Sequence, residues 1–253
     1  MKSMSTMSTN KTRSMPWRVI FTLIMAIVCP SWAAANPTVV QSVVDASSTP
    51  WVTDGVADVT VSSLTVGSTA CIGGGLEANR TFSGASDNGS NTYSIPTNGS
   101  INSAASSVAM ACAKITNPAT VVSLTASSAS GGIGKVFVVE FAGTGASAPT
   151  VATNLTDTTG TTHTIPTLTI TGATPTLLGF GFTHGSEVWT IDATYTQIHN
   201  ANNLVVGYKA VSTNDDMANT TATNAETKGI LVEIVESASV VDSGDLATLG
   251  AGR

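Results

Sequence analysis

The chain has 253 residues, with 10 Lys plus Arg, 16 Asp plus Glu and a formal net charge of −6. Four of the basic residues and none of the acidic ones precede position 36, which leaves 6 against 16, a net charge of −10, for residues 36–253. A chain this acidic, without a basic cluster, repels phosphate backbones, which argues against nucleic-acid binding. Apolar residues make up 42% of the sequence and supply core material, which argues against general disorder.

The first 35 residues have the order of a secretory signal. Basic residues at positions 2, 11, 13 and 18 precede an apolar run, 19–28, and small residues at Ala33 and Ala35 suit cleavage before Asn36. The run has about ten residues, against the roughly 20 of a membrane-spanning helix. We therefore expect a secreted, periplasmic or extracellular protein whose mature chain has no transmembrane segment. Lipid anchoring at Cys29 is the alternative, although Val28 before it is not small.

Two cysteines, Cys71 and Cys112, remain after removal of the signal. In an oxidising compartment a remaining pair tends to be bridged, so we expect a disulfide. It would close a loop of about 40 residues and stabilise the fold by about 3 to 4 kcal/mol. The alternative is a pair of buried thiols that pack as small hydrophobic groups.

Short segments rich in Val, Thr and Ile recur along the mature chain between clusters of turn-forming residues, as in strands. Several alternate between polar and apolar residues, which indicates one buried and one solvated face. Two others, 135–141 and 229–235, are almost continuously apolar, as in central strands covered on both faces. The predicted strands are 38–44, 56–66, 69–76, 92–95, 107–115, 120–126, 135–142, 163–171, 176–183, 188–191, 194–199, 203–211 and 228–235.

Many short strands without intervening helices predict an all-β fold, a single antiparallel β-sandwich of jelly-roll type over residues 36–236. An immunoglobulin-like sandwich or two small β domains, divided at the small-residue segment 143–149, are the alternatives. The strand at 228–235 has no obvious partner in the second half, which favours one domain. Residues 237–253 lack a strand pattern and are expected to form a flexible tail.

Six strand and turn segments carry a resemblance: LTVGS at 64–68, SDNGSNTY at 86–93, VFVVEFAG at 136–143, GTTHT at 160–164, NLVVGYKAV at 203–211 and GILVEIV at 229–235. Together they resemble jelly-roll β-sandwich modules of lectin-like or galactose-binding type, found in secreted bacterial and bacteriophage proteins. The resemblance spans about 38–236 and implies a sandwich fold in a surface, adhesive or virion-associated protein. Cys71 and Cys112 depart from that pattern, because they replace ordinary apolar or aromatic strand residues.

No pattern of a known catalytic site is complete. A G-x-S-x-G nucleophile elbow is absent, and the glycine-rich stretch 130–135 departs from a phosphate-binding loop. Glu140 and Glu233 lie in the two most apolar strands, and either one is the candidate acid or base of the alternative hypothesis, a polysaccharide hydrolase. Glu233 and Glu236 are three residues apart on one strand, so we expect their side chains on opposite faces. No catalytic residue is assigned.

Aromatic side chains indicate one possible ligand site. Trp189 and Tyr195 flank a predicted hairpin turn that contains Asp192, and sugar rings pack on exposed Trp and Tyr faces. The three residues are therefore the predicted glycan contact. The alternative for Trp189 is packing in the core.

Calcium is the one cofactor considered, because secreted sandwiches bind it through oxygen-rich loops. Asp87, in an Asp-Asn-Gly turn, and the adjacent pair Asp215 and Asp216 are the predicted ligands. Neither segment has EF-hand spacing, and both compositions also form ordinary turns.

These observations favour an exported, non-enzymatic β-sandwich protein that binds a glycan or a cell surface, or that has a structural role outside the cell. A secreted polysaccharide-active hydrolase is one alternative. A structural protein of a phage virion or filament is another, although an export signal argues against assembly in the cytoplasm.

Overall fold

The computed structural model describes residues 35–45, 51, 55–103, 105–127, 134–157, 160–185, 187–201 and 203–238. Within these ranges the chain forms sixteen β-strands and no helix. The expected signal through position 34, Cys29 included, lies outside the described residues, as does the expected tail from position 239.

The first half of the chain builds two antiparallel sheets. One has five strands in the order β1-β8-β3-β6-β5, and the other has three in the order β2-β7-β4. The bounds are β1 (Thr38–Val44), β2 (Val56–Thr60), β3 (Thr69–Leu76), β4 (Phe82–Asp87), β5 (Ser100–Asn102), β6 (Ser107–Lys114), β7 (Val121–Ala126) and β8 (Gly134–Ala142).

The second half repeats this arrangement strand for strand. Its sheets have the orders β9-β16-β11-β14-β13 and β10-β15-β12, which become the orders of the first half when counting restarts at β9. The bounds are β9 (Ala152–Asp157), β10 (Thr162–Leu168), β11 (Thr176–Thr183), β12 (Trp189–Thr190), β13 (Thr196–Ala201), β14 (Leu204–Ala210), β15 (Asp215–Thr221) and β16 (Thr227–Ile234). Each half has the strand order of a jelly roll, with its fifth strand moved beside the sixth. The predicted fold class, an all-β antiparallel sandwich, is confirmed, and the architecture occurs twice.

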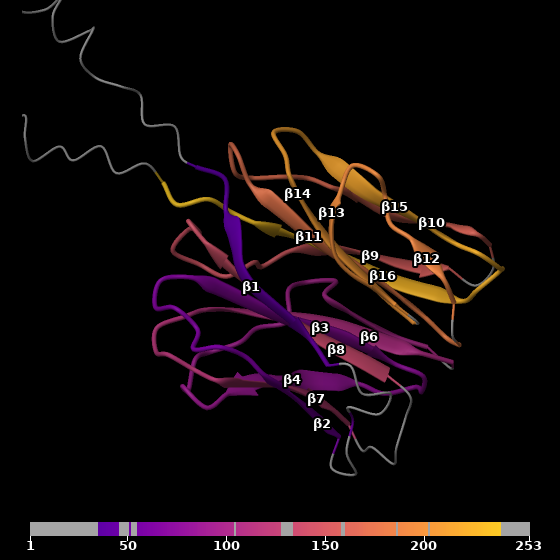
Figure 1. The fold of residues 1–253 in the computed structure, drawn as a ribbon, viewed down its shortest axis with the longest axis horizontal. Coiled ribbons are helices and arrows are strands. Elements are labelled where there is room, and N and C mark those ends of the chain that lie inside the picture. The colour runs from indigo at the N-terminus through magenta and orange to yellow at the C-terminus, as the bar shows by residue number, and fades with distance from the viewer. Residues whose placement is uncertain are drawn as a thin grey trace, which may run out of the picture. The chain divides into compact units, whose positions relative to one another are not determined.

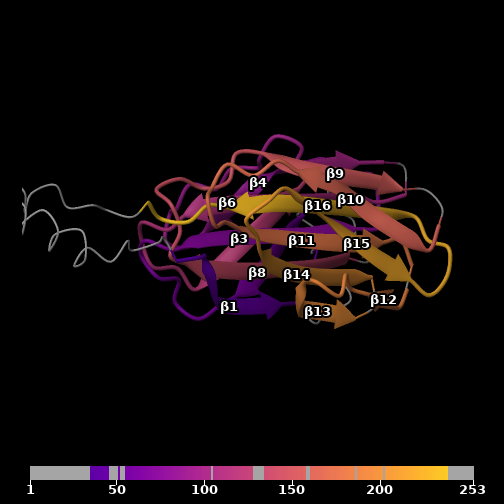
Figure 2. The same ribbon diagram turned by 90° about the horizontal axis from the view of Figure 1, so that it is seen from above.

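Hydrophobic side chains fill the spaces between the four sheets, which are stacked as layers of three, five, five and three strands (Figure 1). One cluster, with Ile72 and Val122, lies within the first half, and another, with Met217 and Leu231, lies within the second. The cluster between the two five-stranded sheets includes Phe137 and Phe180, whose ring centroids are 5.2 Å apart. Seen from above, the strands of these two sheets run along one another (Figure 2).

The two cysteines lie opposite each other on neighbouring strands, Cys71 on β3 and Cys112 on β6. Their sulfur atoms are 2.08 Å apart, so the expected pair is at disulfide-bonding distance. Both side chains are fully buried in the cluster between the halves. The bridge therefore links the two central strands that also carry the packing between the jelly rolls.

The expectation that the last strand finds no partner in the second half is wrong. β16 pairs on one side with β11 and on the other with β9, and both neighbours belong to the second half. β9 was not predicted because its sequence, ATNLTD, is mostly polar. Each half thus completes its own five-stranded sheet.

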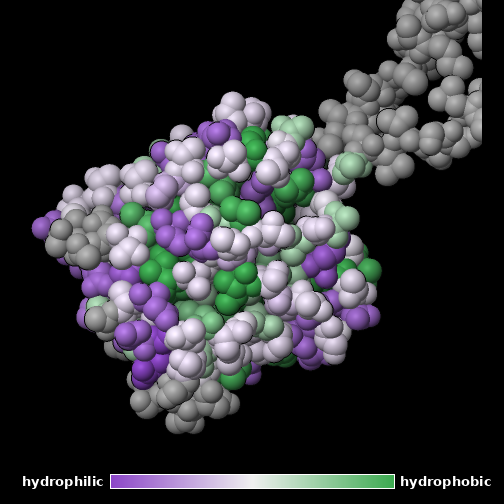
Figure 3. Space-filling model, turned by 180° about the vertical axis from the view of Figure 1, so that it is seen from behind, coloured by the Kyte–Doolittle hydropathy of each residue, from purple (hydrophilic) through white to green (hydrophobic). Residues whose placement is uncertain are grey.

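The surface of the described chain is poor in positive charge. All five described basic side chains are buried or half-buried, and Lys135 and Lys228 are only 6% and 0% exposed. One face of the molecule shows hydrophobic residues in small groups among polar ones (Figure 3). Uncharged hydroxyl and amide side chains therefore provide much of the contact with water.

Candidate functional site

Two glutamates occupy equivalent places in the two halves. Glu140 pairs with the second residue of β3, and Glu233 pairs with the second residue of β11. Glu140 Oε1 accepts hydrogen bonds from the backbone N–H of Thr65 and the hydroxyl of Ser68, both at 2.7 Å. Each of these donors lies in the loop that leads into β3, so the carboxylate ties that loop to β8.

Glu233 repeats the contact in the second half. Its Oε1 accepts from the N–H of Thr171 at 2.7 Å and of Gly172 at 2.8 Å, and its Oε2 accepts from the Thr171 hydroxyl at 2.9 Å. Gly172 lies four residues before β11 as Thr65 lies four residues before β3, so these two N–H donors correspond. The two halves share a loop anchor as well as a strand order.

Glu236 does not project away from Glu233 as predicted. Its Oε1 accepts from the N–H groups of Ala173 at 2.6 Å and Thr174 at 3.0 Å, in the same loop that Glu233 binds. The alternation fails because β16 ends at Ile234 and the chain leaves strand geometry there. Burial alone would raise the pKa of Glu236, but backbone hydrogen bonds outweigh it and hold the pKa below its ordinary value.

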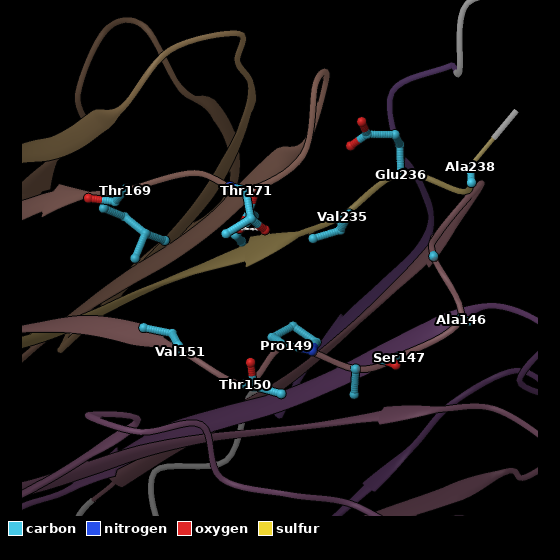
Figure 4. A pocket seen from close by; sticks show the side chains of 14 residues that line it. Ala146, Ser147, Pro149, Thr150, Val151, Thr169, Thr171, Val235, Glu236 and Ala238 are labelled. Carbon is cyan, nitrogen blue, oxygen red and sulfur yellow. Dashed lines mark hydrogen bonds between the residues drawn. The ribbon is translucent and has the colours of Figure 1, made fainter.

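An open groove of about 690 Å³ lies beside these anchors, at the junction of the two halves (Figure 4). We call it the junction groove. Its walls are the linker between β8 and β9, the chain that follows β10, and the end of β16. The lining residues are Gly145, Ala146, Ser147, Ala148, Pro149, Thr150, Val151, Leu168, Thr169, Thr171, Glu233, Val235, Glu236 and Ala238.

The groove exists because two paired segments separate. Thr144 forms an antiparallel bridge with Glu236, and Ala152 pairs with Val232 in β16. Between these two contacts the linker has seven residues and the β16 side has three. The longer segment must bend outward, which leaves the edge of β16 uncovered at this place (Figure 4).

The lining of the groove is uncharged apart from Glu233 and Glu236, and none of its residues is basic. Val151 is 54% exposed, and Ser147, Thr150 and Thr169 are exposed hydroxyl-bearing residues. The Glu233 carboxylate already accepts three hydrogen bonds from its loop. The groove therefore has the chemistry of a binding site for a neutral ligand with apolar and hydrogen-bonding groups.

The predicted glycan contact does not offer open ring faces, because Trp189 and Tyr195 are only 2% and 5% exposed. Trp189 packs edge-on against His163, with ring centroids 5.7 Å apart. The Tyr195 hydroxyl donates to the backbone oxygen of Asp216 at 2.8 Å, and burial raises the pKa of this tyrosine. Both rings pack in the hydrophobic core, which was the alternative for Trp189. They therefore do not form the exposed surface on which a sugar ring was expected to stack.

Asp192, the third residue of that prediction, organises a turn. Its Oδ1 accepts from the N–H and hydroxyl of Thr194 at 2.8 and 2.7 Å, and its Oδ2 accepts from the Ala218 N–H at 3.1 Å. Burial would raise its pKa, but these hydrogen bonds and the charge of Lys209 outweigh burial and lower it. The carboxylate thus joins the β12–β13 turn to β15.

The predicted calcium ligands are engaged in local structure. Asp87 accepts from the N–H groups of Gly89 and Asn91, both at 3.0 Å, and from the Asn91 side chain at 2.7 Å. Asp215 forms a salt bridge with Lys209. In the described part of the chain, no three His, Cys, Asp or Glu side chains gather as a metal site would require. Asp87 therefore fits the turn-forming alternative, whereas Asp215 and Asp216 begin β15.

Comparison with known proteins gives no relative. No protein family, curated protein or solved structure matches the chain. The resemblance to lectin-like and galactose-binding modules is therefore supported only as far as the all-β antiparallel sandwich. Among the described residues, no helix is long and apolar enough to cross a bilayer.

The sequence did not predict the groove, although it singled out one segment of its wall. The small-residue segment 143–149, the boundary in the two-domain alternative, forms most of the linker wall. Nothing local indicated that Leu168 and Val235 would face that segment, because strand pairing brings them there. The excess of linker residues over their β16 counterparts is the signal that could have located the groove once the register was known.

Proposed function

We propose that this chain is an exported, non-enzymatic β-sandwich protein that binds a partner at a cell or extracellular surface through the junction groove. The observation that carries the proposal is the groove itself, an open space with a neutral, mixed apolar and hydroxyl lining. The predicted export signal in the first 35 residues supports the location.

The state of the carboxylates supports binding in preference to hydrolysis. A general acid or base must reach its substrate, but Glu140 is 0% exposed and bound to its loop. Glu233 is 8% exposed and accepts three hydrogen bonds from its loop, which keep it in a structural role. The same residues that motivated the hydrolase hypothesis are thus engaged in holding the fold.

A pair of valine substitutions tests the proposal. Val151 lines the groove and Val188 does not, and their side chains are 54% and 72% exposed. In a binding assay with fluorescently labelled residues 36–253 on intact bacteria and on a glycan array, we expect Val151→Arg to weaken binding about tenfold or more. The longer arginine side chain obstructs the groove, and a tenfold change corresponds to ~1.4 kcal/mol.

Val188→Arg is the matched control, because it adds the same charge to an exposed valine outside the groove. It is expected to bind like the unmodified chain. Circular dichroism of both variants shows whether the fold is retained. Flat responses of the unmodified chain on cells and glycans, or equal binding by the two variants, would reject the groove as the binding site.

A further inference from the structure

The first half shows what occupies the place that corresponds to the junction groove. There β1 stays paired with β8 to the end of the strand, through Gln41 with Glu140, Val39 with Phe141 and Thr38 with Ala142. The Gln41 side chain donates from Nε2 to Glu140 Oε2 at 2.6 Å and to the backbone oxygen of Ser62 at 3.1 Å. An extended segment thus covers the last three residues of β8.

The second half lacks this cover. Ala152 pairs with Val232, the counterpart of the Ser42–Val139 pair in the first half, and the β9–β16 ladder ends there. The preceding residue, Val151, would stand opposite Glu233 but lies outside that ladder, and it forms a parallel bridge with Thr97 through Thr150 O and Ala152 N. Glu233 and Ile234, the last residues of β16, therefore lack the strand partner that the matching residues of β8 have.

The walls of the groove match the surroundings of Gln41. Glu233 corresponds to Glu140, and Thr169, three residues before Gly172, corresponds to Ser62, three residues before Thr65. Both Glu233 and Thr169 line the groove. The groove thus lies where a carboxamide side chain sits between a carboxylate and a loop in the first half.

We infer that the junction groove binds a short extended segment of a partner protein, added antiparallel to the end of β16, with a carboxamide side chain directed at Glu233. This rests on the proposed function, since it names the ligand of the same site. Strand addition supplies main-chain hydrogen bonds, and alternate side chains supply specificity. The segment is uncharged and rich in β-branched residues, like Thr38–Gln41, because the facing wall is aliphatic and hydroxyl-bearing.

A synthetic peptide with the sequence of residues 36–41, NPTVVQ, blocked at its C-terminus and labelled at its N-terminus, is the probe. Fluorescence anisotropy measures its binding to residues 36–253 and to the Val151→Arg and Val188→Arg variants. We expect binding to the unmodified chain and to Val188→Arg, and about tenfold weaker binding to Val151→Arg. Replacing the peptide's Gln by Leu is expected to weaken binding about tenfold, as loss of a hydrogen bond to a charged group does.

The site is located independently by nuclear magnetic resonance. Addition of the peptide is expected to shift the amide signals of Glu233, Val235 and the linker wall, and to leave those of Glu140 and Gln41 in place. Shifts at Glu140 and Gln41 alone would mean that the peptide displaces β1, which would overturn the inference. Equal affinity for the Gln and Leu peptides would overturn the predicted role of the carboxamide.

The outcomes separate this inference from the proposed function. Cell or glycan binding that Val151→Arg abolishes, without any peptide binding, overturns the inference and leaves the proposed function standing. If the unmodified chain binds neither the peptide nor cells and glycans, both the inference and the proposed function are overturned. Self-association of the unmodified chain in sedimentation, abolished by Val151→Arg, would identify a second copy as the occupant and overturn the assignment to a partner protein.

Discussion

Glu140 illustrates how a charged residue is accommodated in an apolar strand. Its strand neighbours Val139 and Phe141 face the cluster between the halves, while its own side chain faces the interior of the first jelly roll. There it is fully buried but accepts three hydrogen bonds, from Gln41, Thr65 and Ser68. A buried charge is tolerated when such donors replace water. The residue therefore has a structural reason for its position.

Glu140→Gln is expected to lower the free energy of unfolding by about 2 kcal/mol, because an amide replaces a charged acceptor and presents N–H groups to other donors. Urea denaturation measures this. Glu187→Gln is the control, since Glu187 is half-buried and accepts from the exposed hydroxyl of Thr223. It should change stability by less than about 0.5 kcal/mol. Equal effects of the two substitutions would contradict the anchoring role of Glu140.

Asp192 predicts a dependence of stability on pH. Its hydrogen bonds with Thr194 and Ala218 place its folded pKa below the unfolded value of about 4. The group therefore stabilises the fold fully above that value, and the contribution is lost as the pH falls through the folded pKa. Urea midpoints measured between neutral and acid pH should fall less steeply for Asp192→Asn than for the unmodified chain. Parallel curves would contradict this assignment.

At the scale of elements, irregularities collect where strands have a free edge. The four register shifts lie in β1, β4, β10 and β13, and each of these strands is at the edge of its sheet. Two further edge strands, β5 and β12, have only three and two residues. Bulges and short strands prevent edge-to-edge pairing between molecules. The uncovered end of β16 is different, because it lies within a groove and is accessible to a short segment only.

The strands that the sequence predicted well are those in which packing follows a local pattern. The predicted bounds 38–44, 69–76 and 176–183 match β1, β3 and β11. The structure also contains β4, β5, β9 and β15, which were not predicted, because their residues are mostly small or polar. The Asp215–Asp216 pair was interpreted as a calcium loop, although it begins β15.

At the scale of the whole molecule, close packing between the halves depends on a missing side chain. A Cβ at Gly75 in β3 would lie 2.2 Å from the Phe182 ring of β11. Both residues belong to the central five-stranded sheets, and Phe182 is part of the cluster between the halves. The glycine therefore allows the two jelly rolls to approach each other at this point.

Gly75→Ala is expected to lower the free energy of unfolding by about 1 to 3 kcal/mol, because overpacking displaces the Phe182 ring. Thermal and urea denaturation measure the change. The double variant Gly75→Ala/Phe182→Leu should cost less than the sum of its single variants, since the smaller side chain relieves the clash. Additive effects in the double variant would contradict direct packing between these residues.

Alternation, continuous apolar runs and cysteine number are local or countable, so the all-β class, several central strands and a candidate pair of Cys71 with Cys112 could be predicted from the sequence. Only the tertiary structure decided that the jelly roll occurs twice, that Trp189 and Tyr195 are buried, and that a groove opens at the junction. These features depend on which strands pair and in what register. The groove forms because the linker has four residues more than the β16 side between the same two contacts. That difference appears only when the two paired segments are compared.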